Sequence, residues 1–320
     1  MIKYITKRIL MILPIVLAII FVLFVLLYML PASRIRQIPI YGSHDTLDSL
    51  FTFFHASDNL ITKYFRYCYN VFFHFDFGQT GSMSPLLIYE LPARIRTTLI
   101  LLTSGIGATL IFGIPIGVYS AVHKGSKRDR AISIVTLLFS SLPNYSLAML
   151  IVLVFVLYLK ILPMLPGYMS PESFYMPMLT IALGGISSIA RITRASMLEI
   201  LEMPYITALR TKGLKEANVV YHALKNALVP VVSVLGSFIS QMLFGTFVIE
   251  HFFNVPGLGS YLLRSMGMRA HFEILGCTVV VTIILAITNI LADIFYAFLS
   301  PQIRLRFVLK ANSRLKRGIS

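Results

Sequence analysis

The sequence has little charge, and acidic residues are especially scarce. Charged side chains make up 13% of its 320 residues, whereas hydrophobic ones make up 57%, and the mean hydropathy is +0.81. So few charges could not cover the surface of a soluble domain of this length. The composition therefore excludes an ordinary soluble protein and indicates an integral membrane protein.

The motifs of several catalytic classes are also absent. The sequence contains no Gly-Lys dipeptide, which excludes a phosphate-binding loop of the Walker A form. It has neither His-Glu-x-x-His nor Gly-x-Ser-x-Gly, the motifs of metalloproteases and serine hydrolases. Its two cysteines, Cys68 and Cys277, have no metal-ligand spacing and indicate no disulfide framework. We expect no catalytic residue, no metal site and no cofactor bound by this chain.

Six long apolar runs predict six transmembrane helices and hence an all-α, polytopic fold. The first, 9–30, is long enough to cross a hydrocarbon layer of about 30 Å. A cleaved signal peptide is the competing interpretation, but its apolar core would have only about 7 to 15 residues. In the second run, Gly113 and Gly117 lie four residues apart and predict close packing against another helix. The other spans are predicted at 97–122, at 131–158 with a kink at Pro143, at a fourth run opening with 177–190, at 229–249 and at 274–299.

The distribution of the 28 lysine and arginine residues predicts the orientation. Most of them precede the first span, follow the second, lie between the fourth and fifth, or belong to the tail. Because cytoplasmic loops are rich in these residues, both termini and the segment between spans four and five are expected in the cytoplasm. Cations beside anionic lipids also account for the net charge of +15 without nucleic acid. The predicted organisation is 1–30, an N-terminus and first span; 31–96, an extracytoplasmic element; 97–301, the membrane core with a cytoplasmic loop at 203–228; and 302–320, a basic tail.

The extracytoplasmic element contains one pattern of helical spacing. Ile61, Tyr64, Phe65, Cys68 and Phe72 recur at that spacing, as in an amphipathic helix. Its aromatic residues are typical of a helix at the membrane surface, and docking of a partner is the alternative. The predicted topology places Cys68 outside and Cys277 within the sixth span, so we expect a membrane-impermeant reagent to reach Cys68 from outside but not to reach Cys277.

The cytoplasmic loop belongs to a mostly polar stretch, 203–236, between two apolar runs. Pro204 suits the first turn of a helix, and Gly213 suits a left-handed stop about two turns later. From Leu214 onward, apolar residues again recur at helical spacing as far as Leu228. We expect two short helices joined at the glycine, although an ordinary amphipathic loop between membrane helices is the alternative.

Three ionisable residues lie in or near the predicted spans. Asp293 follows Asn289 by four residues on one helical face and is expected either to make hydrogen bonds between helices or to serve transport. Glu250 and His251 lie at the outer end of the fifth span, where solvent is expected and a role in substrate access is open. An ion-coupled secondary transporter using Asp293 and Glu250 is therefore one candidate function, but clear internal repeats and interrupted helices are not visible.

Three stretches carry a resemblance to a known family. The sequences ALRTKGL, HALKNALVPVV and EHFFNVPGLG resemble the coupling loop and following segment in permease subunits of binding-protein-dependent ABC importers, in the dipeptide, oligopeptide and nickel branch. The general motif of that family begins Glu-Ala-Ala, where this chain has Thr207, Ala208 and Leu209. The resemblance implies a loop that seats in a groove of the ATPase subunit. The implied coupling residues are Ala208, Leu209, Arg210, Lys212, Gly213, Leu214 and Lys215.

The same resemblance implies the partners and the reaction. A second homologous permease subunit, two ATPase subunits carrying ATP and Mg, and an extracytoplasmic binding protein are expected, in a bacterial cytoplasmic (inner) membrane. The chain itself would not be an enzyme, because ATP hydrolysis would take place on the separate subunits. It would move a dipeptide, a longer peptide or a nickel chelate inward by alternating access, with selectivity largely in the binding protein.

Overall fold

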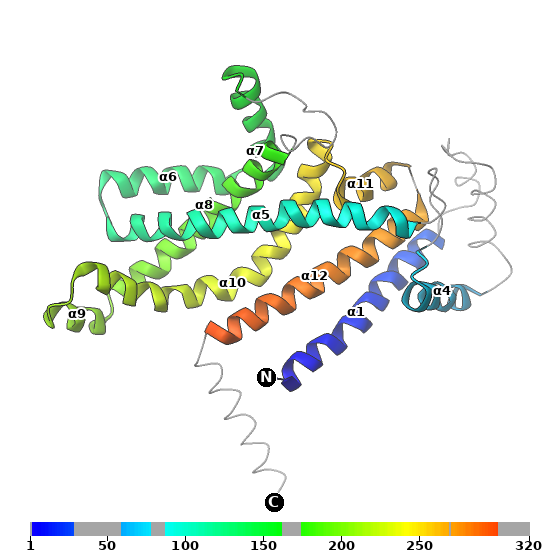
Figure 1. Ribbon diagram of the computed structural model, residues 1–320, viewed down its shortest axis with the longest axis horizontal. Helices are drawn as coiled ribbons and strands as arrows, with labels where there is room; N and C mark the ends of the chain where they lie inside the picture. The colour runs from blue at the N-terminus through cyan, green and yellow to red at the C-terminus, as the bar shows by residue number, and fades with distance from the viewer. Residues whose placement is uncertain (1, 29–58, 78–86, 162–173, 269, 300–320) are drawn as a thin grey trace, which may run out of the picture. The chain divides into compact units, whose positions relative to one another are not determined.

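The structure, a computed structural model, describes residues 2–28, 59–77, 87–161, 174–268 and 270–299. Every regular element within these ranges is a helix, which confirms the all-α prediction (Figure 1). The elements are α1 (Ile2–Tyr28), α4 (Leu60–Tyr69), η1 (Asn70–His74), α5 (Leu87–Val122), α6 (Lys127–Ser141), α7 (Asn144–Ile151), η2 (Val152–Tyr158), α8 (Tyr175–Leu201), α9 (Pro204–Thr211), α10 (Glu216–Phe252), α11 (Leu258–Met268) and α12 (His271–Leu299).

Four of the described helices are long and apolar enough to cross a membrane, namely α5, α8, α10 and the part of α12 from Glu273 to Ala292. A fifth candidate exists if α6 and the α7–η2 segment form one bent span. In α1 the apolar helical segment, Leu10–Leu26, is shorter. The described residues therefore contain four or five candidate spans, and a total of six remains a prediction.

The third predicted span is not one kinked helix. Between Lys127–Ser141 and Asn144–Tyr158 the axis turns by 112°. Leu142 and Pro143 are both extended, with ψ of 133° and 146°. Proline cannot donate a backbone hydrogen bond, and it disfavours the helical conformation of the residue before it. These two effects explain why the helix ends here, whereas the sequence predicted one helix kinked at Pro143.

The chain forms two compact units, and α5, α8, α10 and α12 each contribute to both. Unit 1 consists of Met1–Leu102, Lys160–Pro177 and Leu243–Ala286. Its core joins α1, α4 and α12 through buried apolar side chains. They include Val16, Ile20, Phe24, Tyr64, Tyr67, Cys68, Val71, Leu275 and Val279.

The amphipathic helix predicted in the extracytoplasmic element is present as α4 and η1. One face of it packs on α1, where the Tyr64 hydroxyl donates to the carbonyl of Leu17 at 2.9 Å. Cys68 lies on that buried face, and burial raises the pKa of its thiol. Because reagents attack the exposed thiolate, this burial contradicts the accessibility that the labelling prediction assumes for Cys68, while the side of the membrane on which Cys68 lies stays a prediction. Ile61 and Phe65 are exposed instead.

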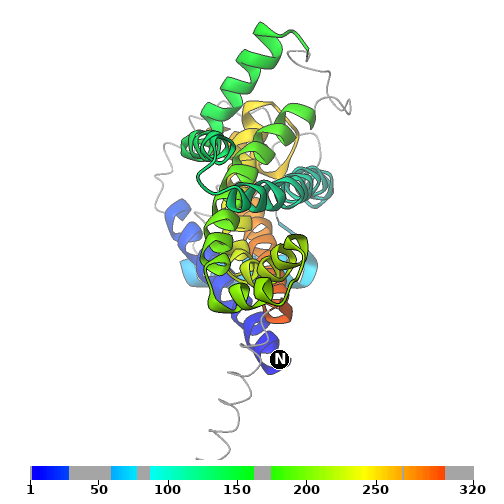
Figure 2. The ribbon, with the colours of Figure 1, turned by 90° about the vertical axis from the view of Figure 1, so that its left-hand side faces the viewer.

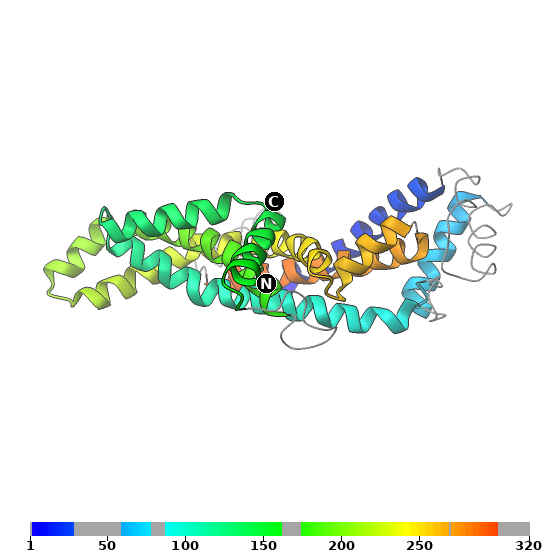
Figure 3. The same cartoon turned by 90° about the horizontal axis from the view of Figure 1, so that it is seen from above.

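Unit 2 consists of Thr103–Leu159, Met178–Met242 and Ile287–Ser320. Within it α5 and α8 pack closely. A Cβ at Gly117 would lie 2.5 Å from the carbonyl oxygen of Ala190, and one at Gly113 would lie 3.1 Å from the Ile189 side chain. This confirms that the two glycines permit close approach. In the same unit α9 and the turn between α5 and α6 lie at one end (Figure 3), and Figure 2 views unit 2 from that end.

Candidate functional site

The end of α9 has the glycine stop that the sequence predicted. Gly213 has a φ of +79°, a conformation that costs glycine no steric clash. Its N–H bonds to the carbonyl of Arg210 at 2.9 Å, and the N–H of Leu214 bonds to the carbonyl of Leu209 at 3.3 Å. This pair of bonds is the Schellman arrangement. The helix begins with Pro204 in its first turn, also as predicted.

The second helix of the loop is not short. It is the beginning of α10, which runs for 37 residues from Glu216 to Phe252 and contains Pro230. Helical apolar spacing continues on both sides of that proline, and no glycine between 214 and 230 offers a left-handed stop. Loss of one backbone hydrogen bond is therefore not enough to end the helix, and the expected boundary before 229–249 is wrong.

The predicted coupling loop is anchored by its apolar side chains. Ile206 of α9 and Val219 and Ala223 of α10 are fully buried against Met197 of α8 and Ala121 of α5. Leu209 and Leu214 pack against the same cluster and are half-buried. The remaining predicted coupling residues are exposed, namely Ala208, Arg210, Lys212, Gly213 and Lys215. The loop therefore presents a small, mainly basic surface on a packed support.

Polar contacts fix the loop further. The guanidinium of Arg210 bonds to the Glu216 carboxylate across the glycine turn, with 2.7 Å between Nη2 and Oε1. Lys124 reaches Glu202 just before α9, at 2.6 Å, and its hydrogen bond lowers the pKa of that carboxyl group. Because these two ion pairs are exposed, they orient the side chains of the loop but add little to the folding stability.

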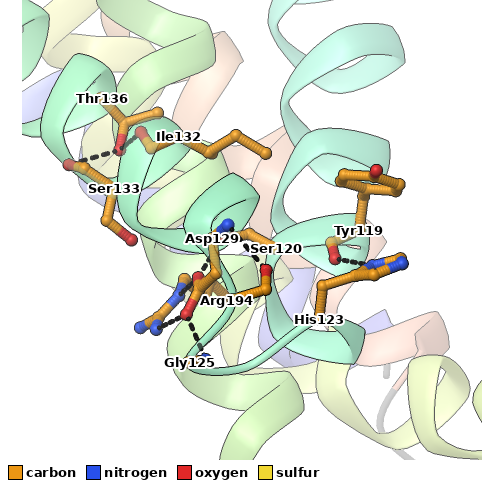
Figure 4. A network of polar contacts seen from close by, with 10 residues as sticks. Tyr119, Ser120, His123, Gly125, Asp129, Ile132, Ser133, Thr136 and Arg194 are labelled. Carbon is orange, nitrogen blue, oxygen red and sulfur yellow. Dashed lines mark hydrogen bonds and ion pairs between the residues drawn. The ribbon is translucent and has the colours of Figure 1, made fainter.

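A buried ion pair joins α5, α6 and α8 beside this loop (Figure 4). Arg194 of α8 makes two hydrogen bonds to Asp129, at 2.7 Å to Oδ1 and 2.9 Å to Oδ2. The hydroxyl of Ser120 in α5 donates to Oδ1 at 2.6 Å, and the N–H of Gly125 donates to Oδ2 at 2.9 Å. The side chain of Asp129 is 4% exposed, and that of Arg194 is 30% exposed. We call these four residues the Asp129 clamp.

The Asp129 clamp was not predicted from the sequence. The turn between α5 and α6 was interpreted only as a group of cations. One local signal was available, because Ser126 and Asp129 have the Ser-x-x-Asp spacing of a helix start. The Ser126 hydroxyl does accept a hydrogen bond from the N–H of Asp129, at 3.1 Å. The pairing with Arg194, 65 residues away, had no such signal.

In unit 1, Glu250 is fully buried, so the expectation of nearby solvent is wrong. Its Oε1 accepts from the Thr98 hydroxyl at 2.6 Å. Its Oε2 accepts from the N–H groups of Gly259 and Ser260 at 2.8 and 3.1 Å. Gly257 has no side chain to cap α11, and a Cβ there would overlap the Glu250 carboxylate. The acid thus caps the first turn of α11 from outside that helix, which explains the acid and Gly257 in EHFFNVPGLG, whereas Gly259 makes room for Phe247.

The other two ionisable residues do not join this arrangement. His251 is exposed. Asp293 lies in α12, but its side chain is outside the described residues. Asn289 accepts a hydrogen bond from the Ser240 hydroxyl of α10 at 3.4 Å, which confirms bonding between helices for the asparagine of the predicted pair.

Comparisons with known proteins identify the family of the chain. The family model described as binding-protein-dependent transport system inner membrane component matches residues 113–305. The dipeptide transport system permease protein DppB of Bacillus subtilis is 33% identical over 95% of this chain and 99% of its own length. The oligopeptide transport system permease protein OppB of Haemophilus influenzae is 28% identical over 95% and 100%. The glutathione transport system permease protein GsiC of Salmonella paratyphi A is 30% identical over 95% and 99%.

The matched family range contains the Asp129 clamp, the coupling loop and Glu250. The similarity to the dipeptide permease extends over almost the whole of both chains. The chain therefore belongs to the family of inner membrane components of binding-protein-dependent transport systems, the permease subunits of ABC importers.

Proposed function

We propose that this permease subunit moves peptides, delivered by an extracytoplasmic binding protein, into the cytoplasm. The names of the dipeptide, oligopeptide and glutathione permeases that it resembles along most of its length support a peptide-like substrate. The family decides between the two candidate functions, because an ABC importer obtains its energy from an ATPase partner and not from an ion relay through Asp293 and Glu250. The chain is accordingly a permease and not itself an ATPase.

The coupling loop is the part of the chain that we assign to contact with the ATPase. The observation that carries this assignment is the combination of an exposed basic surface with a buried apolar support. Arg210, Lys212 and Lys215 would meet the ATPase groove, while Leu209 and Leu214 hold their orientation. ATP-driven closure of the ATPase subunits would displace α9, and the apolar cluster and the Asp129 clamp would carry that displacement to α5, α6 and α8.

The assembly that we propose has a second homologous permease subunit and two ATPase subunits, which bind the ATP and Mg. The proposed topology has six spans, both termini in the cytoplasm, an extracytoplasmic element at 31–96 and a cytoplasmic tail at 302–320. The concentration of lysine and arginine in the segments assigned to the cytoplasm supports this topology.

Labelling of introduced thiols tests the proposed topology. The two native cysteines, Cys68 and Cys277, are both buried, so an introduced exposed cysteine should dominate the labelling. Phe65→Cys should react from outside, and Lys212→Cys should react only in inverted vesicles. The reverse pattern would refute the orientation.

Reconstitution tests the transport function. The purified chain is combined in proteoliposomes with its cognate ATPase subunits and binding protein, and uptake of labelled dipeptides and longer peptides is measured. Uptake should require both ATP and the binding protein, and the loaded binding protein should raise ATP hydrolysis. Peptide uptake by the isolated chain driven by an ion gradient would contradict the proposal.

Two substitutions at one position test the coupling loop. A β-branched side chain at Gly213 would be strained at its φ of +79°, whereas asparagine adopts this conformation readily. No other atom lies within 4 Å of a Cβ there, so neither change creates a clash. Gly213→Val should reach the membrane in near-normal amounts but lose peptide-stimulated ATP hydrolysis, and Gly213→Asn should retain it. Equal peptide-stimulated ATP hydrolysis in the two variants would contradict a coupling role of this turn.

Gly125 is a less suitable control than its similar φ of +77° suggests. Its N–H is one of the donors to Asp129. Gly125→Val is therefore expected to disturb the Asp129 clamp as well as its own turn, and comparison of valine with asparagine at Gly213 avoids that ambiguity.

A further inference from the structure

We propose that unit 2 has a binding site for an anionic phospholipid, with one acyl chain in a groove between α5, α6 and α8 and the phosphate at Arg128. The groove has a volume of about 650 Å³ and is open along one side. Its wall is almost entirely apolar and includes Ile116 of α5, Val135 and Phe139 of α6, and Ile186 of α8. The three helices are candidate spans or part of one.

The wall contains no charged residue, and its hydroxyl groups belong to Tyr119, Thr136 and Ser187. Thr136 is one of the lining residues. Its hydroxyl already donates to the carbonyl of Ile132 in its own helix, at 2.8 Å (Figure 4). An acyl chain fits such a surface because it has no hydrogen-bonding group. Within a bilayer an open apolar groove fills with hydrocarbon at no desolvation cost.

One end of the groove carries a cation. Arg128 lies four residues before Ile132 and seven before Val135, so helical spacing places it on the groove-lining face of α6. Its Nη1 donates to the hydroxyl of Tyr119 at 3.0 Å, and Tyr119 is itself a lining residue. A guanidinium has five N–H donors in a planar fork, which suits a phosphate. The tyrosine contact uses one of them and holds the group at the groove's end.

The neighbouring charges favour an anion at this end. Asp129 follows Arg128 in sequence, but its carboxylate is bound by Arg194, Ser120 and Gly125. Lys127 and Arg130 are exposed on the same turn of helix. An apolar groove that ends in an exposed cation complements an anionic phospholipid. A helix of a second permease subunit could also cover the apolar wall, but an anionic phospholipid fills the groove and pairs with Arg128 at once.

The absence of tryptophan from the sequence permits a direct test with the full-length chain. Phe139→Trp puts a single fluorophore in the groove. Phe112→Trp puts one on an exposed position of α5 that does not line it. Each variant is reconstituted in phosphatidylcholine vesicles containing an equal small fraction of brominated phosphatidylglycerol or of brominated phosphatidylcholine, and bromine quenching is measured.

At Phe139→Trp the brominated anionic lipid should quench with about fivefold higher apparent affinity than the zwitterionic one, the factor expected of one interfacial cation. At Phe112→Trp the two lipids should quench alike. Adding Arg128→Gln to Phe139→Trp should remove the preference. Arg128→Lys and Arg130→Gln should largely preserve it, since the first retains a cation at the groove and the second changes a residue on another face of α6.

Three results would each overturn the proposal. The first is equal quenching of Phe139→Trp by both lipids with Arg128 in place. The second is an unchanged preference in Arg128→Gln when Arg128→Lys shows that the variants fold. The third is a Phe139→Trp fluorophore that neither brominated lipid quenches while both quench Phe112→Trp, because protein and not lipid would then cover the groove.

Discussion

Each of the two units contains a buried carboxylate, and the two are stabilised by different means. Asp129 in unit 2 faces a guanidinium that makes two hydrogen bonds to it. Glu250 in unit 1 receives hydrogen bonds from a hydroxyl and from two backbone N–H groups at the start of α11. Removing one partner of a buried ion pair leaves an uncompensated charge, whereas removing the charge from a site of neutral donors leaves no charge behind.

The two carboxylates have different structural roles. The ion pair of Asp129 holds together three helices next to the loop that we assign to the ATPase. Glu250 holds a glycine-containing turn against its own helix, α10, and against Thr98 of α5. Substitutions at the first site should therefore affect coupling as well as stability, and substitutions at the second should affect mainly the local fold of the turn.

The largest effect is expected from Arg194→Met, which leaves the Asp129 charge buried with only the Ser120 and Gly125 donors. We expect a loss of about 3 kcal/mol, at the low end for a broken buried pair because Arg194 is partly exposed. Thermal unfolding of the purified chain in detergent measures it. Asp129→Asn should cost less, since Arg194 can then turn to water. The double variant Asp129→Asn with Arg194→Met should be more stable than the sum of the two losses implies; strict additivity would show that the pair is not coupled.

The next largest loss of stability is expected from a substitution beside Glu250. Gly257→Ala would place a methyl group in the space of the Glu250 carboxylate, and should destabilise the chain by about 1 to 3 kcal/mol by overpacking. Gly267→Ala in α11 is the matched control, since nothing lies within 4 Å of a Cβ there, and it should be neutral or slightly stabilising. The apparent melting temperatures of both variants provide the measurement. A Gly257→Ala variant as stable as Gly267→Ala would contradict the described fit of carboxylate to glycine.

The smallest effect is expected from Glu250→Gln. The amide oxygen can still accept from the N–H groups of Gly259 and Ser260, so the loss should be about 1 kcal/mol, and ATP-driven peptide uptake should remain within about twofold of the unmodified protein. Thr98→Val serves as the comparison, because it leaves the N–H of Leu258 without its hydroxyl acceptor and should cost more. Complete loss of uptake in Glu250→Gln, with stability retained, would contradict this purely structural role and show that transport requires the ionisable carboxyl group.

Patterns that depend on neighbouring residues could be predicted, and pairings between distant residues could not. The turn at Gly213 was predictable because a helix stop needs a left-handed residue at one known position. The packing of Gly113 and Gly117 was predictable because it needs only spacing. The contacts of Asp129 with Arg194 and of Glu250 with Thr98, 65 and 152 residues apart, depend on how the helices pack, and no periodicity records that. The continuation of α10 through Pro230 was missed for a related reason, since a proline weakens a helix locally while tertiary packing decides whether it continues.

The break at Pro143 has a consequence for whatever surrounds it. A helix end leaves up to four carbonyl groups without partners in its own helix, and a helix start leaves up to four N–H groups. Here α6 ends and α7 starts within two residues of each other, and 142–145 are exposed in the isolated chain. Lipid tails cannot satisfy these groups, and each unsatisfied one costs several kcal/mol in hydrocarbon. If the bend lies at the depth of the hydrocarbon, it therefore adjoins a water-filled passage or the surface of another subunit rather than lipid tails.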